Sequence, residues 1–429
     1  MRILVVGSGG REHALTWKIA QSPLVERVYC APGNAGMAQI AEIISLGVND
    51  IDALADFAEA NEIDLTVVGP EAPLIAGIVD RFEARGLRIF GPNADPAQIE
   101  GSKVFAKKLM QTANIPTAAF WICDSLAVAQ ARVHDYYAAQ GPDAKIVIKA
   151  DGLAAGKGVV IANDEAEAET ALRQMMTERI FGDAGSVVVL EEYLVGEEAS
   201  IMAITDGVTI VPFPAAQDHK RIGEGDTGPN TGGMGAYTPV PAAPQEIVAE
   251  AVAKILEPAI AAIAELGIPY RGILYAGVIM TAQGVKAIEF NCRLGDPETQ
   301  TVLPMLESDI VPLLLSVTDC TLDQQNLKWR SGASVCVVAA SGGYPGAYQM
   351  DKPISGIAAA EADGCLVFQS GTKRGETGEL LTDGGRVLSV TGLGATIMDA
   401  TAQAYVGVSH IEFEAMRFRR DIAHRALRS

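Results

Sequence analysis

Apolar runs alternate with stretches of helical periodicity over the first hundred residues. Short apolar runs that end in Gly or Pro predict buried strands, and apolar residues repeated every three or four positions predict the helices between them. The strands are RILVVG, VYCAPG, DLTVVGP and RIFGP, and the helices cover residues 11–21, 51–60 and 74–85. This alternation predicts a Rossmann-like parallel sheet with right-handed crossovers. Ligands bind such sheets beyond the carboxyl ends of the strands, which here read GSGGREH, APGNAG and GPEAPL.

The pattern changes after about residue 95, where a helix over 95–113 leads into a mixed segment. Further helices are predicted over 125–139, 164–179 and 244–266, and strands over 145–149, 158–162, 187–191, 198–205, 272–280 and 285–290. Residues 206–240 are rich in Gly and Pro and predict a long loop, and their Asp, His, Lys, Arg and Asn side chains favour a function for it. From about residue 325, short strands and Gly turns predict a small α+β domain.

Length and pattern together predict a multidomain protein that combines α/β and α+β parts. The chain has 429 residues, which is longer than a chain that folds around a single hydrophobic core usually is. We expect an N-terminal Rossmann-like domain over 1–100, a central domain over 101–325 and a small C-terminal α+β domain over 326–429.

The net charge, the lengths of the apolar runs and the spacing of the cysteines indicate which partners and which compartment to expect. A formal net charge of −20 opposes binding to nucleic acid, whose phosphates need local Lys and Arg. The N-terminal apolar run is too short for a signal peptide, and no run approaches the roughly 20 apolar residues that span a bilayer. The cysteines are scattered, without zinc-ligand spacing, and favour reduced thiols. We therefore expect a cytoplasmic protein that binds neither nucleic acid nor membrane.

The turn GSGGREHA after the first strand places Gly9 and Gly10 where a helix begins, so that backbone N–H groups can meet an anion. A dinucleotide site needs a third glycine where Glu12 stands and an acid after the second strand, where Ala31 stands. An NAD site is therefore disfavoured. Binding of a phosphate or carboxylate and a simple chain turn both stay open, and His13 is interpreted as a packing or capping residue.

A second glycine-rich turn, IVIKADGLAAGKGVV, follows an apolar strand that ends near Lys149. A P-loop requires four residues between its first glycine and the Gly-Lys pair, and then Ser or Thr. Here three residues separate Gly152 from Gly156, and Gly158 follows Lys157. The turn is therefore not a P-loop, and it connects two strands.

Polar residues at the end of the strand KAIEF indicate a site for a metal and an anion. Glu289 and Asn291 are two positions apart and share one face of the strand. Their oxygens suit Mg²⁺, and Arg293, two positions further, can clamp a phosphate or a carboxylate. The alternative is a solvated strand edge, which the polar Gly-Asp-Pro turn after the strand makes the weaker interpretation.

Three weaker signals accompany this site. Glu71 in GPEAPL is equally well explained as a site carboxylate or as a helix-start residue. Lys103 in EGSKVFAKKL, taken alone, is more typical of a surface lysine. The strand-to-loop passage LEEYLVGEEAS can hold an adenine and a ribose.

In their order along the chain, the motifs resemble those of the phosphoribosylamine–glycine ligase family, also called glycinamide ribonucleotide synthetases, within the ATP-grasp superfamily. The resemblance covers essentially the whole chain and rests on GSGGREHALTWK, APGNAG, VGPEAPL, IKADGLAAGKGV, QDHKR, DTGPNTGGMGAY and EFNCRLGDPETQ. It implies a central ATP-grasp fold with a flexible ATP-binding subdomain at about 118–195. It also implies a ligase of de novo purine (IMP) biosynthesis that uses ATP, with Mg²⁺ or Mn²⁺, to join glycine to 5-phospho-β-D-ribosylamine. The implied route passes through glycyl phosphate, which a turn over residues 150–158 would shield from water.

The resemblance further implies roles for individual residues. Those implied for ATP are Lys103, Lys149, Gly152, Gly156, Lys157, Gly158, Glu191, Glu192, Leu194 and Glu198. Those implied for the metal are Glu289 and Asn291, and those for catalysis are Arg293, Asp296 and Lys220. Those implied for phosphoribosylamine and the acceptor pocket are Gly9, Gly10, Arg11, Asn34, Glu71, Asp218, Asn230, Gly232 and Gly233.

One departure from the superfamily pattern leaves the number of metal ions open. Many ATP-grasp enzymes place a further acidic ligand on the strand before the Glu-x-Asn strand, and GILYAGVIM has none. We expect a monomer, with transient contact to the enzyme that supplies phosphoribosylamine. The alternative functions are another ATP-grasp ligase or carboxylase, an oxidoreductase that uses NAD(P), and a nucleotide-binding regulator without turnover.

Overall fold

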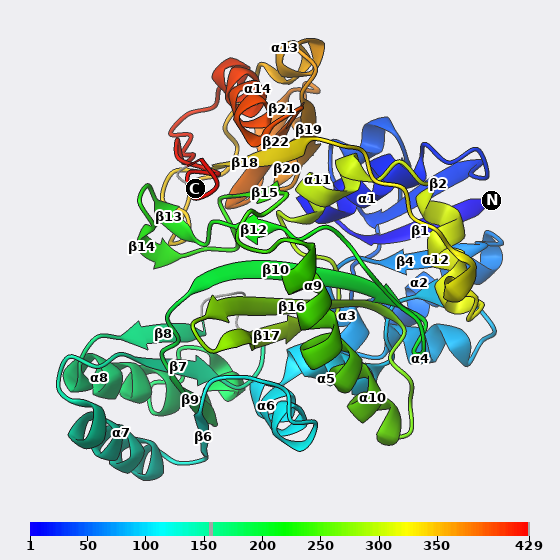
Figure 1. Cartoon of the computed structure of the whole chain (residues 1–429). Coiled ribbons are helices and arrows are strands. Elements are labelled where there is room, and N and C mark those ends of the chain that lie inside the picture. Colours follow the sequence, from blue (N-terminus) through cyan, green and yellow to red (C-terminus); the bar gives the residue numbers. More distant parts are fainter. Residues whose placement is uncertain (154–157, 428–429) are drawn as a thin grey trace.

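The computed structural model describes residues 1–153 and 158–427. Figure 1 shows a long central sheet (green) with the N-terminal part (blue) on one side, the C-terminal part (orange and red) above and a small lobe (teal) at the lower left. Because these parts meet around the central sheet, residues far apart in the sequence come together there.

The N-terminal part is a five-stranded parallel sheet in the order β3-β2-β1-β4-β5. Its central strands are apolar and buried because helices cover both faces of a parallel sheet. The strands are β1 Arg2–Gly7, β2 Arg27–Pro32, β3 Glu42–Ile43, β4 Leu65–Val68 and β5 Ile89–Phe90, and the helices are α1 Gly10–Ile19, α2 Ile51–Ala60, α3 Glu71–Ile75 and α4 Ile78–Glu83. The carboxyl ends of β1 and β4 lead into the turns that hold Gly9 and Glu71.

Two antiparallel sheets follow, each of four strands. The order β6-β9-β7-β8 forms the small lobe, in which α7 and α8 complete a separate hydrophobic core, and the order β11-β10-β16-β17 forms the central sheet. The lobe contains β6 Phe120–Cys123, α7 Leu126–Gln140, β7 Ile146–Ala150, β8 Val159–Ala162, α8 Glu165–Met176 and β9 Val188–Glu192. The central sheet contains β10 Glu197–Thr205, β11 Ile210–Pro212, β16 Gly272–Thr281 and β17 Gly284–Asn291, and the helices near it are α5 Ala94–Gly101, α6 Lys103–Thr112, α9 Gln245–Ala251, α10 Glu257–Glu265, α11 Thr299–Val302 and α12 Ile310–Thr318.

The C-terminal part is a five-stranded antiparallel sheet in the order β12-β15-β18-β22-β19. Its first two strands, β12 Gln217–Asp218 and β15 Gly235–Thr238, come from the loop-rich segment, so the sheet joins residues from both sides of position 325. The remaining elements are the hairpin β13 Arg221–Gly223 and β14 Thr227–Asn230, then β18 Ala333–Ala340, α13 Ile357–Ala362, β19 Leu366–Gln369, β20 Thr372–Arg374, β21 Leu380–Thr382, β22 Arg386–Gly394 and α14 Ile397–His410.

Three predicted elements are wrong in detail. The single helix predicted over 95–113 is two helices, because Ser102 is extended and its hydroxyl caps α6 by accepting from the Phe105 N–H at 3.0 Å. The helix predicted over 74–85 is also two, broken at Gly77, whose φ of +88° is a left-handed conformation that glycine adopts freely. The segment 206–240, predicted as a loop, contains the five short strands β11 to β15.

The helix predicted over 244–266 is continuous, with a π-helical turn at Val252–Leu256 between α9 and α10. Within the described residues, no helix combines the length and the apolar character needed to cross a membrane.

Candidate active site

The carboxyl end of β17 carries the predicted metal ligands, with Glu289 and Asn291 two positions apart. A β-bulge at Ile288 places Glu289 opposite Gly277 of β16, where a Cβ would approach the Glu289 side chain to 3.2 Å. Burial alone would raise the pKa of Glu289, but the surrounding positive charges lower it to about 2. These charges, in decreasing order of influence, belong to Lys220, Lys103, Lys149 and Arg293. Glu289 is therefore an ionised carboxylate surrounded by cations.

Two buried lysines and one glutamate, which we call the lysine cluster, lie next to this bulge. Glu191 on β9 pairs with Lys107 on α6 and with Lys149 on β7, each at 2.8 Å. Lys149 Nζ also donates to the carbonyl oxygen of Ile288 at 3.1 Å. The three side chains are at most 4% exposed, and burial lowers the pKa of Lys107 to about 8 although Glu191 opposes that shift.

One arginine and two glutamates form a second group, the arginine cluster, just beyond β17. Arg293 Nε pairs with Glu71 at 3.1 Å, and Arg293 NH2 pairs with Glu100 at 2.6 Å. Glu100 also accepts from the backbone N–H of Cys292 at 2.7 Å. Burial alone would raise the pKa of Glu71, but Arg293 and then Arg11 lower it to about 2. The cluster thus connects the N-terminal part to the segment just after β17.

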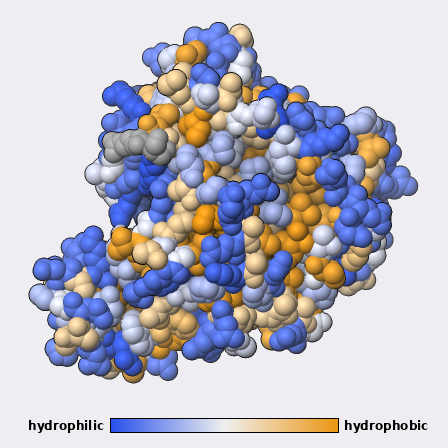
Figure 2. All heavy atoms as spheres, viewed as in Figure 1, coloured by the Kyte–Doolittle hydropathy of each residue, from blue (hydrophilic) through white to orange (hydrophobic). Residues whose placement is uncertain are grey.

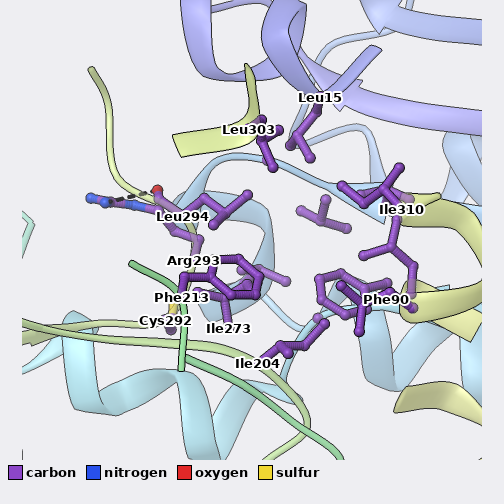
Figure 3. A pocket seen from close by; sticks show the side chains of 17 residues that line it. Leu15, Phe90, Ile204, Phe213, Ile273, Cys292, Arg293, Leu294, Leu303 and Ile310 are labelled. Carbon is purple, nitrogen blue, oxygen red and sulfur yellow. Dashed lines mark hydrogen bonds between the residues drawn. The ribbon is translucent and has the colours of Figure 1, made fainter. Parts of the chain in front are cut away.

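An apolar cavity of about 20 Å³ lies behind Arg293. Figure 3 shows that its lining comes from several parts of the fold, including Leu15, Phe90, Ile204 and Leu303, and that the Arg293 guanidinium points away from it. An apolar space of this size holds at most one water molecule. It is a packing defect and not a substrate site.

The glycine turn after β1 faces Asp296. A Cβ at position 9 would lie 3.5 Å from Asp296 Oδ2, whereas the N–H of Gly9 donates to Glu12 within the turn at 2.7 Å. A Cβ at position 10 would collide with Gln300 at 2.5 Å. The absence of a side chain at Gly10 therefore allows the close approach of this turn to Gln300 in the segment after β17, whereas a Cβ at position 9 would be at ordinary contact distance from Asp296.

Arg11 and Asn34 hold the chain around this turn. Arg11 NH1 donates to the carbonyl oxygen of Leu294 at 3.1 Å. The Asn34 side chain donates to the carbonyls of Ser8 at 2.8 Å and Gln369 at 2.7 Å, and it accepts from two backbone N–H groups. These bonds connect the N-terminal turn to the C-terminal part.

Arg386 on β22 fixes Asp296 and the turn at Gly232. Its NH1 donates to the carbonyl oxygens of Gly232 at 2.7 Å and Asp296 at 2.8 Å, and its NH2 pairs with the Asp296 carboxylate at 3.2 Å. Burial would raise the pKa of Asp296, but Arg386 and then Arg11 keep it below its usual value. At Gly233 the φ is +115°, and a Cβ would lie 2.4 Å from Pro297.

Residues 217–235, which we call the 217–235 loop, bring a further cation and carboxylate to the site. Lys220 Nζ pairs with Glu198 at 3.1 Å, and its carbonyl oxygen accepts from the N–H of Thr231 at 2.7 Å. Burial raises the pKa of Asp218; Lys220 opposes this rise and the carboxylate of Glu298 adds to it.

A cleft of about 690 Å³ opens beside the same loop. It is lined by β8, by the β13–β14 hairpin including Asn230, and by the C-terminal turn Gly343–Gly346. In Figure 2 the surface is hollowed on the left between the lower lobe and the rest of the molecule.

Three family models match consecutive parts of the chain and together cover most of it. They are the phosphoribosylglycinamide synthetase N domain over residues 1–100, the ATP-grasp (A) domain over 101–299 and the C domain over 334–425. The chain belongs to the phosphoribosylglycinamide synthetase family.

Similar proteins agree with this assignment. A phosphoribosylamine–glycine ligase from Nostoc sp. is 50% identical over 429 residues, which is 99% of each chain, and the one from Escherichia coli K12 is 48% identical over 430 residues, with 100% of this chain and 99% of that protein covered. The crystal structure of phosphoribosylamine–glycine ligase from Thermotoga maritima superposes with a TM-score of 0.84 at 30% identity, covering 98% of this chain and 100% of that one. The biotin carboxylase domain of a Hydrogenobacter thermophilus 2-oxoglutarate carboxylase, at 15% identity and a TM-score of 0.72 over 97% of this chain and 91% of that one, shares the fold.

The predicted family, the multidomain fold class and the enzyme class, a ligase of the ATP-grasp superfamily in purine biosynthesis, are confirmed. In this member of the phosphoribosylglycinamide synthetase family, the structure brings several predicted residues into direct contact: Lys149 with Glu191, Lys220 with Glu198, and Arg293 with Glu71. Gly156 and Lys157 lie outside the described residues. Gly158 is described, and its carbonyl oxygen accepts from the Ala150 N–H at 2.8 Å, which closes the β7–β8 connection; Gly152 there has a φ of +128°.

Sequence reasoning missed three residues that hold the site together, namely Lys107, Glu100 and Arg386. Lys107 had a usable signal, because it lies four positions after Lys103 and three before Met110, on a helical face that is partly buried. Glu100 and Arg386 had no such signal, because their partners are remote in sequence; Glu100 and Arg293 are 193 positions apart.

The residues predicted for adenine and ribose lie at the end of β9 and in the connection to β10. Glu192 closes the strand, and its N–H donates to the carbonyl oxygen of Ala119 at 2.9 Å. Leu194 is half-buried in the connection to β10, where Glu198 follows. The connection between β9 and β10 is therefore a short segment without regular secondary structure.

Proposed function

We propose that the chain catalyses ATP-dependent joining of glycine to 5-phospho-β-D-ribosylamine. The products are glycinamide ribonucleotide, ADP and phosphate. The γ-phosphoryl group of ATP is transferred to the glycine carboxylate, and the amine of phosphoribosylamine then attacks the glycyl phosphate and displaces phosphate. A carboxylate needs such activation because an oxide ion is a poor leaving group, and phosphoryl transfer needs mainly positioning and charge neutralisation.

The observation that carries this proposal is the ionised Glu289 with four cations around it. Lys220 and Arg293 are balanced by other carboxylates, Glu198 for Lys220 and Glu71 for Arg293. Lys103 makes no ion pair with the described residues, and Lys107 and Lys149 share the single carboxylate of Glu191, so this side of the site has positive charge available for an anionic ligand. A triphosphate and the transferring phosphoryl group are ligands of the right charge.

In the proposed complex, Lys103 and Lys149 neutralise the phosphates of ATP. Gly152 and Gly158 belong to the turn that is proposed to cover them. Glu191 orients Lys149 through their 2.8 Å ion pair, while Glu192 and Leu194 flank the adenine and Glu198 binds the ribose. Support for these roles comes from the position of this segment at the end of β9, next to the lysine cluster.

The residues on the other side of Glu289 are proposed to serve glycine and phosphoribosylamine. Arg293, Asp296 and Lys220 are proposed to border the reacting groups. Lys220 and Arg293 lower the pKa of Glu289, and Asp296, held by Arg386, lies in the segment that follows Glu289. The residues proposed to line the pocket are Gly9, Gly10, Arg11, Asn34, Glu71, Asp218, Asn230, Gly232 and Gly233. The approach of Gly9 to Asp296 and the bond from Arg386 to Gly232 support their assembly into one pocket.

The donor set fits a hard divalent cation. Glu289 is ionised, Asn291 adds an amide oxygen, and the described residues contain no group of three His, Cys, Asp or Glu that would hold a metal alone. We therefore propose that Glu289 and Asn291 hold Mg²⁺ together with phosphate oxygens and water, as suits a relative of a carboxylase domain solved with MgADP. When bound, the metal supplies positive charge at the transferring phosphate. Mn²⁺ is accepted by the same ligands.

A coupled ADP-release assay, with glycine and freshly generated phosphoribosylamine omitted in turn, tests this function. We expect ADP release to require both substrates and to give one glycinamide ribonucleotide per ADP, which mass spectrometry counts. Release driven by bicarbonate or another amino acid would assign the chain to another ATP-grasp activity.

We also propose that the domains are 1–100, 101–325, with a moving subdomain at about 118–195, and 326–429. The chain is proposed to act as a cytoplasmic monomer with transient contact to the enzyme that supplies phosphoribosylamine. Light scattering at working concentration tests the monomer: a mass of twice 45.0 kDa would contradict it.

A further inference from the structure

The last described residues of the chain pack on the tip of the β13–β14 hairpin. Figure 1 shows the C-terminal segment (red) beside this hairpin (green). Backbone contacts join them: the N–H of Gly225 donates to Asp421 Oδ2 at 2.8 Å, and the N–H of Arg420 donates to Glu224 Oε1 at 3.3 Å. The two segments are nearly 200 residues apart, so this contact depends on the completed fold.

Arg419 is the centre of this contact. It is 1% exposed, and its NH1 pairs with Asp226 of the hairpin at 2.8 Å while its NH2 pairs with Asp421 at 2.7 Å. NH1 also donates to the carbonyl oxygen of Arg221 at 3.2 Å. Arg419 therefore binds both the strand β13 and the turn after it, and a buried guanidinium with this many partners is held in one orientation.

Asp226 receives a second cation. Arg425 NH2 pairs with its other carboxylate oxygen at 2.7 Å. Asp226 has a φ of +57° in the hairpin turn, so its backbone conformation is one that few residues other than Gly, Asn and Asp adopt. The turn is thus shaped by a residue whose side chain is bound by the C-terminal segment.

An uncharged histidine fills the space beneath the hairpin. His219 is fully buried, and its ring packs edge-on against His424 at 5.4 Å and near Tyr237 at 6.0 Å. Neither ring nitrogen bonds to any of the described residues. Burial, and then the nearby Arg419, lower its pKa to about 3, so His219 stays neutral and acts as an aromatic spacer between the loop and the C-terminal segment.

The position of the β13–β14 hairpin depends on contacts with other parts of the chain. A two-stranded hairpin is at best marginally stable in water, and this one pairs irregularly between Arg221 and Gly223. Residues proposed for the site lie at both ends of the hairpin. Asp218 and Lys220 precede β13, Asn230 ends β14, and Gly232 and Gly233 follow it. Arg386 and the Tyr344 hydroxyl already hold Gly232, so the hairpin tip is the remaining part of the loop that needs an anchor.

We propose that Arg419 is a positioning residue which, through Asp226, sets the 217–235 loop for binding of the acceptor substrates. This inference rests on the proposed function of that loop. In this arrangement the end of the chain completes a site whose other residues come from the central sheet. Arg419 touches no substrate, so its loss should affect affinity for glycine and phosphoribosylamine more than affinity for ATP.

The test uses the full-length chain with Asp226→Asn, Arg419→Gln and Arg419→Lys. Asn tolerates the left-handed conformation, so Asp226→Asn removes the charge and keeps the turn. The matched control is Lys352→Met, which breaks an ion pair of 2.9 Å with Glu414 elsewhere in the C-terminal part. We expect Asp226→Asn and Arg419→Gln to raise KM for both acceptor substrates about tenfold and to change KM for ATP by less than about twofold, since displaced positioning groups cost up to about 100-fold in rate.

Two further readouts separate positioning from a loss of folding. Hydrogen exchange followed by mass spectrometry should show faster exchange over residues 217–233 and unchanged exchange in β18 and β22. Arg419→Lys should be intermediate. Arg419→Gln combined with Asp226→Asn should cost less than the sum of the two single changes, because both remove the Arg419–Asp226 pair, while the pairs with Asp421 and Arg425 are lost separately. If Arg419→Gln does not fold, Asp226→Asn alone decides.

The proposal is overturned if Asp226→Asn leaves acceptor KM values and exchange over 217–233 as in the wild type, or if KM for ATP rises equally. Failure of the proposed function looks different. Wild-type ADP release would then be independent of glycine or phosphoribosylamine, while the hydrogen-exchange comparison still reports whether Arg419 holds the loop.

Discussion

The lysine cluster contacts the chain at Ile288, just before Glu289, and the arginine cluster lies just after β17; their net charges are of opposite sign. In one, a glutamate joins two lysines through two contacts of 2.8 Å; in the other, an arginine joins two glutamates at 2.6 and 3.1 Å. With every group ionised, the first has one positive charge in excess and the second has one negative charge in excess, and the burial of Glu100 raises its pKa and so reduces that negative excess.

Burying a charge that has no partner of opposite sign is costly. A cluster with one unbalanced charge is therefore suited to a ligand of the opposite sign. The lysine cluster matches the phosphates of ATP in the proposed reaction, and the arginine cluster matches the ammonium group of glycine. The two also differ in exposure. The lysine cluster is at most 4% exposed, whereas the Glu71 side chain is 28% exposed at the junction with the N-terminal part.

The strongest test of this comparison removes the carboxylate between the clusters. Glu289→Gln should lower kcat by at least about 100-fold, because the metal and phosphates lose a charged partner in a site sheltered from water. Steady-state ADP release at saturating Mg²⁺ measures this. Glu250→Gln is the control, since Glu250 on α9 lies beside Gly284 at the start of β17, away from Glu289, and pairs with Lys254. Turnover of Glu289→Gln equal to that of the control would remove Glu289 from the mechanism.

Arg293→Lys should break the arginine cluster while keeping its charge. An ammonium group cannot make the two separate contacts of the guanidinium, so one carboxylate loses its partner. We expect a loss in kcat/KM of about 100-fold and destabilisation of roughly 2 kcal/mol, less than the ~3–5 kcal/mol for complete removal of a buried partner. Kinetics and urea unfolding measure the two effects.

Arg81→Lys is the control for this change, because Arg81 pairs with Asp52 on the surface, where the side chains are 50% and 75% exposed. Its effect on unfolding should be within about 0.5 kcal/mol. If Arg293→Lys behaves like Arg81→Lys, the bridge between the two glutamates has no role in the site.

Lys107→Met should remove the excess positive charge of the lysine cluster and leave the Glu191–Lys149 pair in place. KM for ATP should rise about tenfold, which corresponds to about 1.4 kcal/mol of lost attraction. Lys108→Met is the matched control, since Lys108 is exposed on the same helix. An unchanged KM for ATP would mean that the charge of this cluster does not act on the nucleotide.

These clusters also show what a sequence can predict about this fold. Glu289 and Asn291 share a face because of the two-residue period of a strand, and the β7–β8 turn is recognisable from Lys149 and its glycines, so local spacing predicts both. Lys107 and Glu100 act through partners on other elements, and their role follows from a topology that no local pattern encodes. The same holds for the breaks at Gly77 and Ser102, where a single residue decides between one helix and two.

The smallest expected effect is the response of the arginine cluster to acid. The pKa of Glu71 is about 2 in the folded chain and near 4.5 without its partners, so its ion pair stabilises the fold above about pH 4.5 and is lost as the pH falls towards 2. Because Glu71→Gln lacks this contribution, wild type should be more stable than the variant by about 1 kcal/mol at pH 6, a value that allows for solvent screening, and the difference should shrink by pH 3. Urea unfolding at both pH values measures it, with Glu62→Gln as the control because Glu62 is 83% exposed in its pair with Arg2. A difference that stays constant with pH would mean that Glu71 is held by its neighbours without its charge, and the arginine cluster would then have no negative charge in excess.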